Sequence, residues 1–508
     1  MERQATPERS EAAGATVRVL SLRITGNTRF TERELVAAAN IAPGRDLTLT
    51  DLRAAASRIT GYYESRGYFL AQAYLPAQDV SSGAVVIDVI EGRYGKIEVR
   101  NRSSLTDRLA NEKLVGLETN DLVENRPLER RLLLLSDIPG VLVKSTLSPG
   151  ATVGTSDLVV DIDQGDRVTG SIEADNAGNR FTGTYRAGGT INFNNPTGRG
   201  DQLSLRVLAS DSGLAYGRAA YQAPLGDATV GIAFTHLEYE LGREFRVLDG
   251  DGTADIIGLF GSYPLIRSRD ANLYLLGGVD VKALEDDIGL FAVNSDKRLG
   301  VVNLGLAGDW RDGLGSGGSN AGSIGFALGN LDIRSRAERN ADALAARSDG
   351  GFSKVQGSFS RLQSLGGPLS LYGAVRGQLA FNNLDSSEKI QLGGAYGVRA
   401  YPEGEAYGDN GYIATLEARL LLNDQDEGLP GQFQLIGFVD AGEVQFAQKR
   451  FFAGSNHVAL SGIGGGLTWF GPSGIVLKGS YAGKLGDAKS ISQPDRSGRA
   501  WFQIVKLF

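Results

Sequence analysis

The chain has 508 residues, with 70 glycines, two histidines and no cysteine, and its formal net charge at pH 7 is -7. The lack of cysteine excludes disulfides, thiolate metal sites and cysteine nucleophiles. The two histidines, His236 and His457, are far apart in the sequence, which argues against a histidine-rich metal centre. The negative charge argues against nucleic acid as a partner, because nucleic acid is bound by basic surfaces.

No stretch of the sequence approaches the roughly 18 consecutive apolar residues that a transmembrane helix needs. This does not exclude a membrane, because a transmembrane barrel is built from short strands that alternate apolar and polar residues.

Residues 17–92 have the mixed texture of a small α/β domain. A capping box of Thr31 and Glu34 predicts a short helix through Ala39. A second helix is expected over 52–63, where one face holds Leu52, Ala55, Ala56, Ile59 and Tyr63. Strands are expected over 17–24, 68–75 and 84–90.

A similar order of elements repeats in residues 93–165. The expected strands cover 96–100, 141–147 and 157–163, and the expected helices lie near 104–115 and 128–136. Two tandem copies of one small module are an internal repeat. We therefore predict two related domains, 17–92 and 93–165, after an N-terminal tail, 1–16.

From about residue 167 to the end, helical periodicity disappears and short alternating stretches recur. We count about sixteen strands, the eleventh near 369–381 and the last ending at Phe508. Short turns are expected at 195–200, 224–227 and 471–474, and long loops at 241–253, 284–299, 330–350 and 483–498. An even number of strands, with short turns at one end and long loops at the other, predicts an outer-membrane barrel over 166–508.

One segment, 391–412, interrupts the alternation for about twenty residues. It places Arg399 in a run of glycines with three tyrosines, Tyr396, Tyr401 and Tyr407. Long irregular segments inside a regular architecture are usually functional or disordered, and a disordered loop rarely carries so many aromatic residues. We expect this segment to fold into the barrel and Arg399 to meet a carboxylate there.

Several short motifs support a family assignment. In the first domain they are carried by Tyr63, Gly67, Tyr68, Pro76, Gln78, Gly83, Glu91 and Gly92. In the barrel they are Val398, Arg399, Ala400 and Tyr401, against a usual VRGY or VRGF, and Phe438, Asp440 and Gly442, which fit FxDxG. Together the motifs resemble the two-partner secretion transporters (TpsB proteins), in the superfamily of the barrel-assembly factor BamA. The first set resembles that family's polypeptide-transport-associated (POTRA) domain.

The resemblance implies two periplasmic α+β POTRA domains, an all-β barrel of about sixteen antiparallel strands in the Gram-negative outer membrane, and a loop, 382–411, folded into the lumen. The POTRA domains would recognise a secreted, TpsA-like exoprotein, which would cross the lumen unfolded and without ATP. Other implied partners are outer-membrane lipid, lipopolysaccharide and the barrel-assembly machinery. The terminal aromatic residue, Phe508, suits both barrel closure and the insertion signal that this machinery reads.

The resemblance also implies that Arg399 pairs with Asp440 inside the lumen. The strand parity permits this pair, because Asp440 alternates with residues of the outward face. Ala400 replaces the usual glycine, so the backbone there cannot need a conformation open only to glycine. Members of the family often carry an N-terminal plug helix and a linker. About sixteen residues precede the first strand, too few for both, so either the start is trimmed or this member manages without the plug.

Other functions are weighed on the same residues. An insertase of the same superfamily is the main alternative, but such general assembly factors carry more POTRA domains. A passive porin would not explain the N-terminal modules. No cofactor and no enzymatic activity are expected.

Residues 249–255 have a calcium-like carboxylate spacing but lack the glycine and the terminal glutamate of a calcium-binding loop, which favours a solvated loop. The glycine runs at 313–318 and 462–466 suit a turn and a strand rather than phosphate binding.

Overall fold

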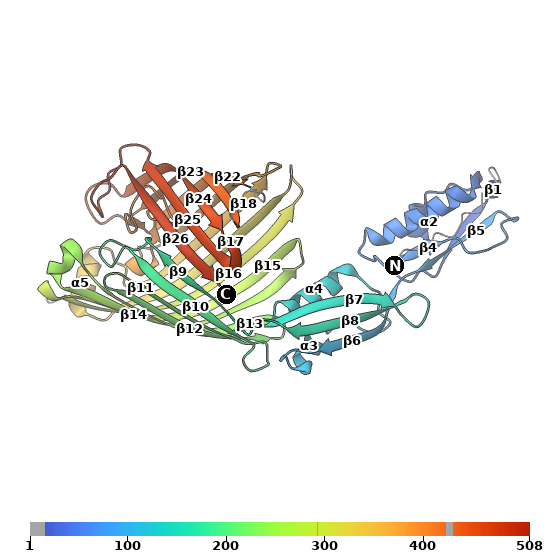
Figure 1. Cartoon of the computed structure of the whole chain (residues 1–508), viewed down its shortest axis with the longest axis horizontal. Coiled ribbons are helices and arrows are strands. Elements are labelled where there is room, and N and C mark those ends of the chain that lie inside the picture. The colour runs from blue at the N-terminus through green and yellow to red at the C-terminus, as the bar shows by residue number, and fades with distance from the viewer. Residues whose placement is uncertain (1–15, 292, 423–429) are drawn as a thin grey trace. The chain divides into compact units, whose positions relative to one another are not determined.

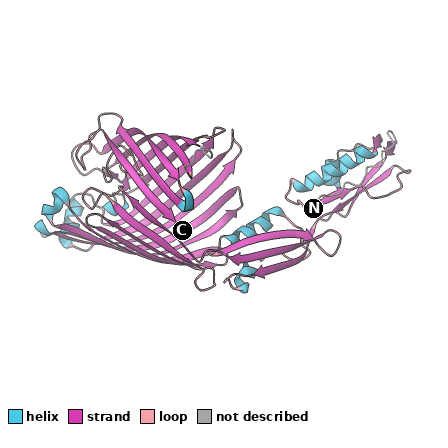
Figure 2. Cartoon of the chain, in the orientation of Figure 1, coloured by secondary structure: helices cyan, strands magenta, loops and turns pink. Residues whose placement is uncertain are grey.

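The computed structural model describes residues 16–291, 293–422 and 430–508. The chain divides into two compact units. The first runs to Gln164 without residues 104–106 and 138–140, and the second holds those short segments and everything from Gly165. Figures 1 and 2 show that the first unit combines helices with strands, whereas the second consists mainly of long strands. Among the described residues, no helix is both long enough and apolar enough to cross a membrane.

The first module of the N-terminal unit is an α+β fold. Its elements are β1(Thr16–Val19), β2(Ser21–Thr25), α1(Glu32–Ala39), β3(Arg45–Thr48), α2(Leu49–Glu64), β4(Gln72–Tyr74) and β5(Ala84–Ile90). The three-stranded sheet has the order β2-β5-β4, and β1 pairs with β3. The predicted single strand over 17–24 is wrong, because the chain changes partners at Leu20. Of the strand predicted over 68–75, only the three residues of β4 are in a strand.

Both helices of this module begin with capping boxes. Thr31 and Glu34 exchange the predicted bonds at the start of α1, and Thr48 and Asp51 form a second box at α2 that the sequence analysis missed. All five residues predicted for the buried face of α2 are buried, confirming its amphipathic register. Ala55, Ala56, Ile59 and Tyr63 pack with β5 residues such as Ile87 and Val89 in one apolar core, whereas Leu52 packs with Val19 and Val85 in a second cluster.

The second module repeats the plan with β6(Arg93–Asn101), α3(Asp107–Lys113), α4(Asn125–Ser136), β7(Val141–Pro149) and β8(Thr155–Gln164). Its sheet has the order β6-β8-β7, with β6 parallel and β7 antiparallel to the central strand. The predicted strands and helices are confirmed, although α3 is shorter than the range 104–115. Only the fifteen N-terminal residues of the predicted tail lie outside the described part of the chain; Thr16 already belongs to β1.

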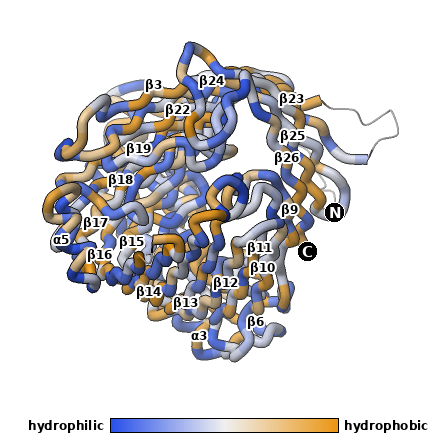
Figure 3. The backbone as a smooth tube through the Cα atoms, turned by 90° about the vertical axis from the view of Figure 1, so that its left-hand side faces the viewer, coloured by the Kyte–Doolittle hydropathy of each residue, from blue (hydrophilic) through white to orange (hydrophobic). Residues whose placement is uncertain are grey.

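The second unit is a closed antiparallel barrel of sixteen strands, as predicted. In ring order they are β9(Val168–Asp175), β10(Arg186–Asn194), β11(Gln202–Ser210), β12(Leu214–Leu225), β13(Ala228–Glu240), β14(Gly250–Arg267), β15(Ala271–Ile288), β16(Val293–Asp312), β17(Gly318–Ile333), β18(Gly350–Ser364), β19(Leu369–Ala380), β22(Asn410–Leu422), β23(Gln432–Gln445), β24(His457–Phe470), β25(Ile475–Lys484) and β26(Gly498–Leu507). Figure 3 looks along this ring and shows β26 beside β9. The predicted eleventh strand is β19.

Large apolar side chains cover the outside of the barrel wall. Neighbouring strands contribute residues that are about half exposed, including Ile232, Phe234, Ile257, Leu259, Val281, Val302 and Leu304. Phe234 pairs with Ile257 and Ile257 with Val281, so these side chains stand in rows on the same face. An outward apolar band of this kind is the surface that a transmembrane barrel presents to lipid.

Some predicted loops are in fact strand extensions. The loop expected at 284–299 is wrong, since β15 and β16 stay paired up to Ile288 and Val293, separated by η2(Gly289–Phe291). The loop expected at 241–253 contains η1(Arg243–Leu248) and the start of β14, so most of the calcium-like stretch lies in a strand. These extensions carry polar residues, and apolar alternation therefore ends before the hydrogen-bonded ladder does.

The loop at 330–350 contains a helix, α5(Arg336–Leu344), capped by Ser335, which the sequence analysis also missed. The turn at 472–474 is the short helix η4(Pro472–Gly474).

The last strand closes the ring. β26 pairs with β9 from Gln503 opposite Asp175 to Leu507 opposite Ser171. Beyond this ladder, the backbone N–H of Phe508 donates to Gly170, and the Gly170 N–H donates to Phe508. The terminal residue therefore takes part in closure, as predicted.

Glu91 is a buried carboxylate that joins three parts of the first module. The N–H groups of Thr28 and Arg29 donate to its Oε1 over 2.7 and 2.8 Å, and the Tyr63 hydroxyl donates over 2.7 Å. Burial raises the pKa of Glu91, but the hydrogen bonds from Thr28, Arg29 and Tyr63 outweigh it, and the pKa of the folded state lies below the ordinary glutamate value.

Acid should therefore destabilise the first module through Glu91. As the pH falls below the ordinary glutamate pKa of about 4.3, the unfolded chain takes up this proton before the folded one, so the free energy of unfolding decreases and keeps decreasing until the folded-state pKa is passed. Limited proteolysis of the full chain at pH values from 7 down to 3 should show that cleavage within residues 16–92 increases once the pH falls below about 4.3.

Glu91→Gln should weaken the module at pH 7 and flatten its pH dependence, because the titrating group is gone. The matched control is Glu64→Gln, since Glu64 is an exposed glutamate of the same module. Equal pH profiles for Glu91→Gln and the unmodified chain would contradict this account.

Candidate functional site

The loop between β19 and β22 is ordered and compact, and we call it the lumen loop (382–409). It contains η3(Ser386–Glu388) and a small pair of strands, β20(Ile390–Gln391) and β21(Tyr407–Gly408). Inside it, the N–H of Val398 donates to the Leu392 carbonyl over 2.9 Å, and the N–H of Tyr401 donates to the Val398 carbonyl over 3.1 Å. These bonds hold the motif at 398–401 in one tight turn.

The turn is buried against one side of the barrel wall. Leu392, Val398, Ala400 and Tyr401 have no exposed surface, and they form one apolar cluster with wall residues such as Ile413, Phe438, Leu460 and Ala482. These wall residues come from β22 to β25. The predicted inward folding of the segment is therefore present in the structure.

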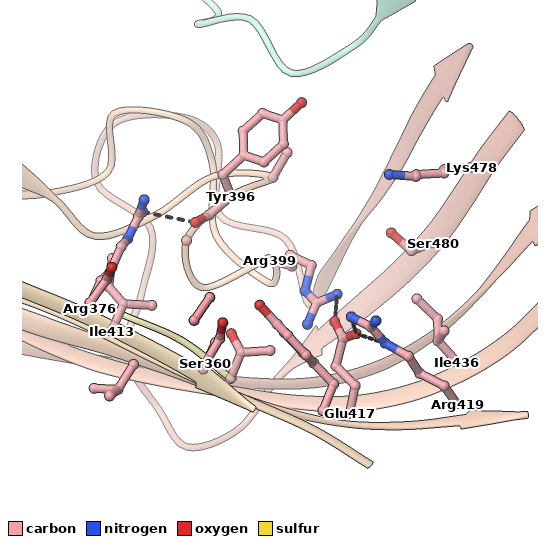
Figure 4. A pocket seen from close by; sticks show the side chains of 18 of the residues that line it. Ser360, Arg376, Tyr396, Arg399, Ile413, Glu417, Arg419, Ile436, Lys478 and Ser480 are labelled. Atoms are coloured by element: carbon pink, nitrogen blue, oxygen red, sulfur yellow. Dashed lines mark hydrogen bonds and ion pairs between the residues drawn. The ribbon is translucent and has the colours of Figure 1, made fainter. Parts of the chain in front are cut away.

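Arg399 is bound by two wall carboxylates, Glu417 and Asp440. Figure 4 shows its ion pair with Glu417. Its Nε and Nη2 donate to the two oxygens of Asp440, each over 2.7 Å, and its backbone N–H donates to Asp440 over 3.2 Å. Its Nη1 lies 2.9 Å from Oε1 of Glu417. The Asp440 side chain is fully buried and that of Arg399 is 12% exposed. The predicted pair is thus bidentate, and such planar geometry is specific to arginine.

Further wall groups complete this site, which we call the arginine site (Arg399, Glu417, Arg419, Phe438 and Asp440). Arg419 donates to Glu417 over 2.7 Å, so two arginines face two carboxylates and the charges balance. The Arg399 guanidinium carbon lies 3.4 Å from the centre of the Phe438 ring. Thr415 donates to Asp440 over 2.9 Å. A buried ion pair is stabilised only when its remaining donors and acceptors are also paired, and these contacts supply that pairing.

A second set of ion pairs anchors the start and end of the lumen loop. Glu388 contacts Lys282 of β15 at 2.5 Å and Lys354 of β18 at 2.8 Å. Asp385 contacts Lys297 of β16 at 3.2 Å. At the other end, Asp409 contacts Lys389 within the loop at 2.6 Å. The start of the loop is therefore fixed to β15, β16 and β18, and the Lys389–Asp409 pair ties its end to its start.

The last two strands of the barrel also hold the loop. The indole N–H of Trp501 on β26 donates to the Arg399 carbonyl over 2.7 Å. The Tyr401 hydroxyl donates to the Ala488 carbonyl over 3.0 Å, and Nζ of Lys484 lies 4.6 Å from the centre of the Tyr401 ring.

Two wall glycines make room for the loop. A Cβ at Gly442 would lie 2.6 Å from Cδ1 of Leu392, and one at Gly462 would lie 2.5 Å from Cβ of Ala400. The glycine of the FxDxG motif is thus required by close approach of the loop. Ala400 is not among the described residues with positive φ, in agreement with the prediction from its replacement of glycine.

Sequence reasoning identified the arginine and one of its carboxylates but assigned no aromatic ring to Arg399. The ring against Arg399 is Phe438 of the wall, whereas Tyr396, Tyr401 and Tyr407 make other contacts. Glu417 and Arg419 were missed. Their positions carry a usable signal, because Thr415 pairs with Asp440 and Glu417 with Phe438 across the ladder, which places them on the lumen face.

The POTRA motif residues build the fold of the first module. Gln78 donates to the Val86 carbonyl and accepts from the Val86 N–H, both over 2.7 Å, so its amide acts as a short strand beside β5. Gly83 and Gly92 have positive φ, and a Cβ at Gly92 would lie 2.5 Å from Cβ of Leu70. Pro76 accepts from Gln78 over 3.3 Å.

Two further motif residues, Gly67 and Tyr68, contact the second module at the start of α4. The carbonyl of Gly67 accepts from the N–H of Asn125 over 2.9 Å, and the Tyr68 hydroxyl accepts from Arg29 over 2.5 Å. Tyr63 and Tyr68 also pack edge to face with Phe30. Within residues 16–291, 293–422 and 430–508, no cluster of three or more His, Cys, Asp or Glu side chains could hold a metal ion.

Loss of Arg399 should destabilise the barrel markedly. Arg399→Ala leaves buried Asp440 without its cation, which costs about 3–5 kcal/mol in comparable sites. The matched control is Arg361→Ala, which removes a similar arginine–aspartate pair whose side chains are 24% and 32% exposed. This pair is more accessible to water than the Arg399–Asp440 pair, and solvent screening lowers the contribution of an ion pair toward about 0.2–1 kcal/mol. Heat-dependent migration of the folded barrel on gels measures the difference, and equal losses for the two variants would contradict the proposed burial.

Comparison with known proteins gives a consistent result. Residues 154–469 match the family described as haemolysin secretion/activation protein ShlB/FhaC/HecB, and residues 17–92 match the ShlB-type POTRA domain. The heme/hemopexin transporter protein HuxB of Haemophilus influenzae (strain 86-028NP) is 27% identical over 471 residues, which cover 92% of this chain and 82% of that protein. The outer membrane transporter CdiB of Escherichia coli is 28% identical over 314 residues, covering 59% and 52%.

Solved structures show the same fold. CdiB from Escherichia coli superposes with a TM-score of 0.77 at 22% identity, covering 99% of this chain and 93% of that one. BamA from Haemophilus ducreyi lacking POTRA domains 1–3 gives a TM-score of 0.55 at 14% identity, covering 97% and 100%. With two POTRA modules, a closed barrel and a family match over most of its length, this chain is an outer-membrane transporter of the haemolysin secretion/activation protein ShlB/FhaC/HecB family, with its POTRA domains in the periplasm.

Proposed function

We propose that this transporter secretes one dedicated partner protein, which its POTRA domains capture and which crosses the barrel beside a lumen loop that stays in place. The observation that carries this proposal is the arginine site, which fixes an ordered loop inside a closed barrel. The relatives support transport of a partner, since both named proteins are transporters. The insertase alternative is not favoured, because the likeness to BamA at 14% identity concerns the fold alone.

The size of the free space in the barrel favours an unfolded client. In the described part of the barrel, cavities of about 980 and 790 Å³ lie beside the lumen loop. A folded domain of 100 residues has a radius of gyration of about 13 Å and could not enter such spaces. An extended chain is much narrower, so we infer that the partner passes as an extended polypeptide.

The POTRA sheets provide edges for capture. The edge strand β7 is nine residues long and, among the described residues, pairs only with β8. An unfolded client can add a strand to such an edge through backbone hydrogen bonds, which are largely independent of its sequence. Side chains next to the edge would then select the dedicated partner.

The remaining partners follow from the barrel surface. The outward apolar band supports contact with lipid and with the lipid part of lipopolysaccharide. The terminal aromatic residue Phe508, about half exposed at the ring closure, supports recognition by the barrel-assembly machinery. Transport would need neither ATP nor catalysis, because folding of the partner outside the cell makes the transfer irreversible.

The proposal predicts that Arg399→Ala reduces secretion even in barrels that are correctly inserted. The ion pairs of Glu388, Asp385 and Asp409 remain, so the barrel should still form, but the freed turn would occupy the remaining passage. The measurement compares the secreted partner in the medium with the amount of folded barrel in the outer membrane.

Arg361→Ala serves again as the matched control and should secrete normally. Normal secretion from inserted Arg399→Ala barrels would overturn the role of the arginine site in transport. Failure of the variant to assemble would restrict Arg399 to a structural role.

A further inference from the structure

The two cavities in the barrel meet at a narrow set of side chains. Among the described residues, four line both cavities: Ser323, Ser358, Arg376 and Tyr396. Ser323 and Ser358 are wall residues of β17 and β18 whose hydroxyls lie 2.7 Å apart. Arg376 belongs to β19, and Tyr396 is the contribution of the lumen loop. These four side chains therefore lie where the two cavities adjoin.

Tyr396 differs from the rest of the turn in which it lies. It is 62% exposed, whereas its neighbours Leu392, Val398 and Tyr401 are fully buried. Its ring therefore adds little to the packing that holds the loop. Its hydroxyl accepts a long hydrogen bond, of 3.3 Å, from Nε2 of Gln503 on β26. An aromatic ring left in open space, on a turn held this firmly, is available to a passing molecule.

The backbone of Tyr396 is held from the opposite side by Arg376. Nη2 of Arg376 donates to the Tyr396 carbonyl over 2.8 Å, and Figure 4 shows the tyrosine ring extending away from the arginine site. The guanidinium thus fixes where the ring stands while leaving its faces free. A rigid backbone with a free aromatic face is a suitable surface for transient contacts, because little conformational freedom is lost when such a ring is touched.

The chemistry of this narrow set fits an unfolded polypeptide. An aromatic ring contacts apolar and aromatic side chains of any sequence, and each such contact contributes modestly. Serine hydroxyls can exchange hydrogen bonds with a passing backbone. Weak and interchangeable contacts are what a moving chain needs, since a strong site would stop it.

We propose that Tyr396 contacts the client in the transport path, and this inference rests on the proposed function. Apolar side chains of the translocating polypeptide would stack on its ring as they pass. Arg376 is the positioning residue that sets the ring in the passage. The ligand class is an extended polypeptide that carries occasional aromatic or large apolar side chains.

Single-channel recording tests this on the full chain in planar bilayers, with two synthetic probes of 30 residues. One is an unstructured glycine–serine peptide, and the other is identical except for three phenylalanines. In the unmodified protein, the phenylalanine peptide should block the current for longer than the glycine–serine peptide. Tyr396→Ala should shorten the phenylalanine blockades by about threefold to tenfold, the loss expected for one aromatic contact, and leave the glycine–serine blockades unchanged.

Two further variants make the result specific. Tyr396→Phe should behave like the unmodified protein, because the ring is kept. Tyr481→Ala removes a tyrosine of similar exposure, 55%, outside the four shared residues, and should change nothing. Phenylalanine blockades of unchanged duration in Tyr396→Ala would overturn the inference while leaving transport intact. An unmodified barrel that admits neither peptide would contradict the proposed function together with the inference.

Discussion

The structure depends on one buried charge pairing, that of Arg399 with Asp440. It is the contact by which the lumen loop and the barrel wall determine each other's positions. Asp440 has no exposed surface, so its charge is tolerable only when the guanidinium is in place. Burial of that charge also requires the bidentate geometry, together with the contacts of Arg399 with the Phe438 ring and with Glu417. Gly442 and Gly462 follow too, since only a wall without side chains at these points lets the turn approach.

This constraint gives the barrel its transport path. A loop fixed by the arginine site on one side, and by lysines of β15, β16 and β18 on the other, leaves free volume beside it. The loop would thus act as an inner wall of the passage rather than as a plug that must leave. In the periplasmic modules, the POTRA motif residues pair with buried groups of the fold, and the strand edges left open are those that we propose for capture of the client.

Much of this could be predicted from the sequence. Strand alternation and strand number were readable because one face of each strand meets lipid. The Arg399–Asp440 pair was accessible through motif resemblance and strand parity. What could not be read were strand extensions such as Glu285 to Ile288, where pairing continues without apolar alternation. The residues that pair with the lumen loop, Glu417, Lys282 and Lys354, could not be predicted either. Their contacts depend on the register of the strands and on the path of the loop, and neither has a local sequence signal.

The central claim is that the lumen loop stays inside the barrel while the partner passes. A reversible tether tests it most directly, since the chain has no cysteine of its own. Cysteines in place of Lys282 on β15 and Glu388 of the lumen loop, whose side chains form an ion pair at 2.5 Å, can be joined by a bis-methanethiosulfonate reagent. Secretion would be measured with this bridge formed and after its reduction, beside each single-cysteine variant. Equal secretion in both states is the predicted result; secretion that stops when the bridge forms and returns on reduction would contradict it.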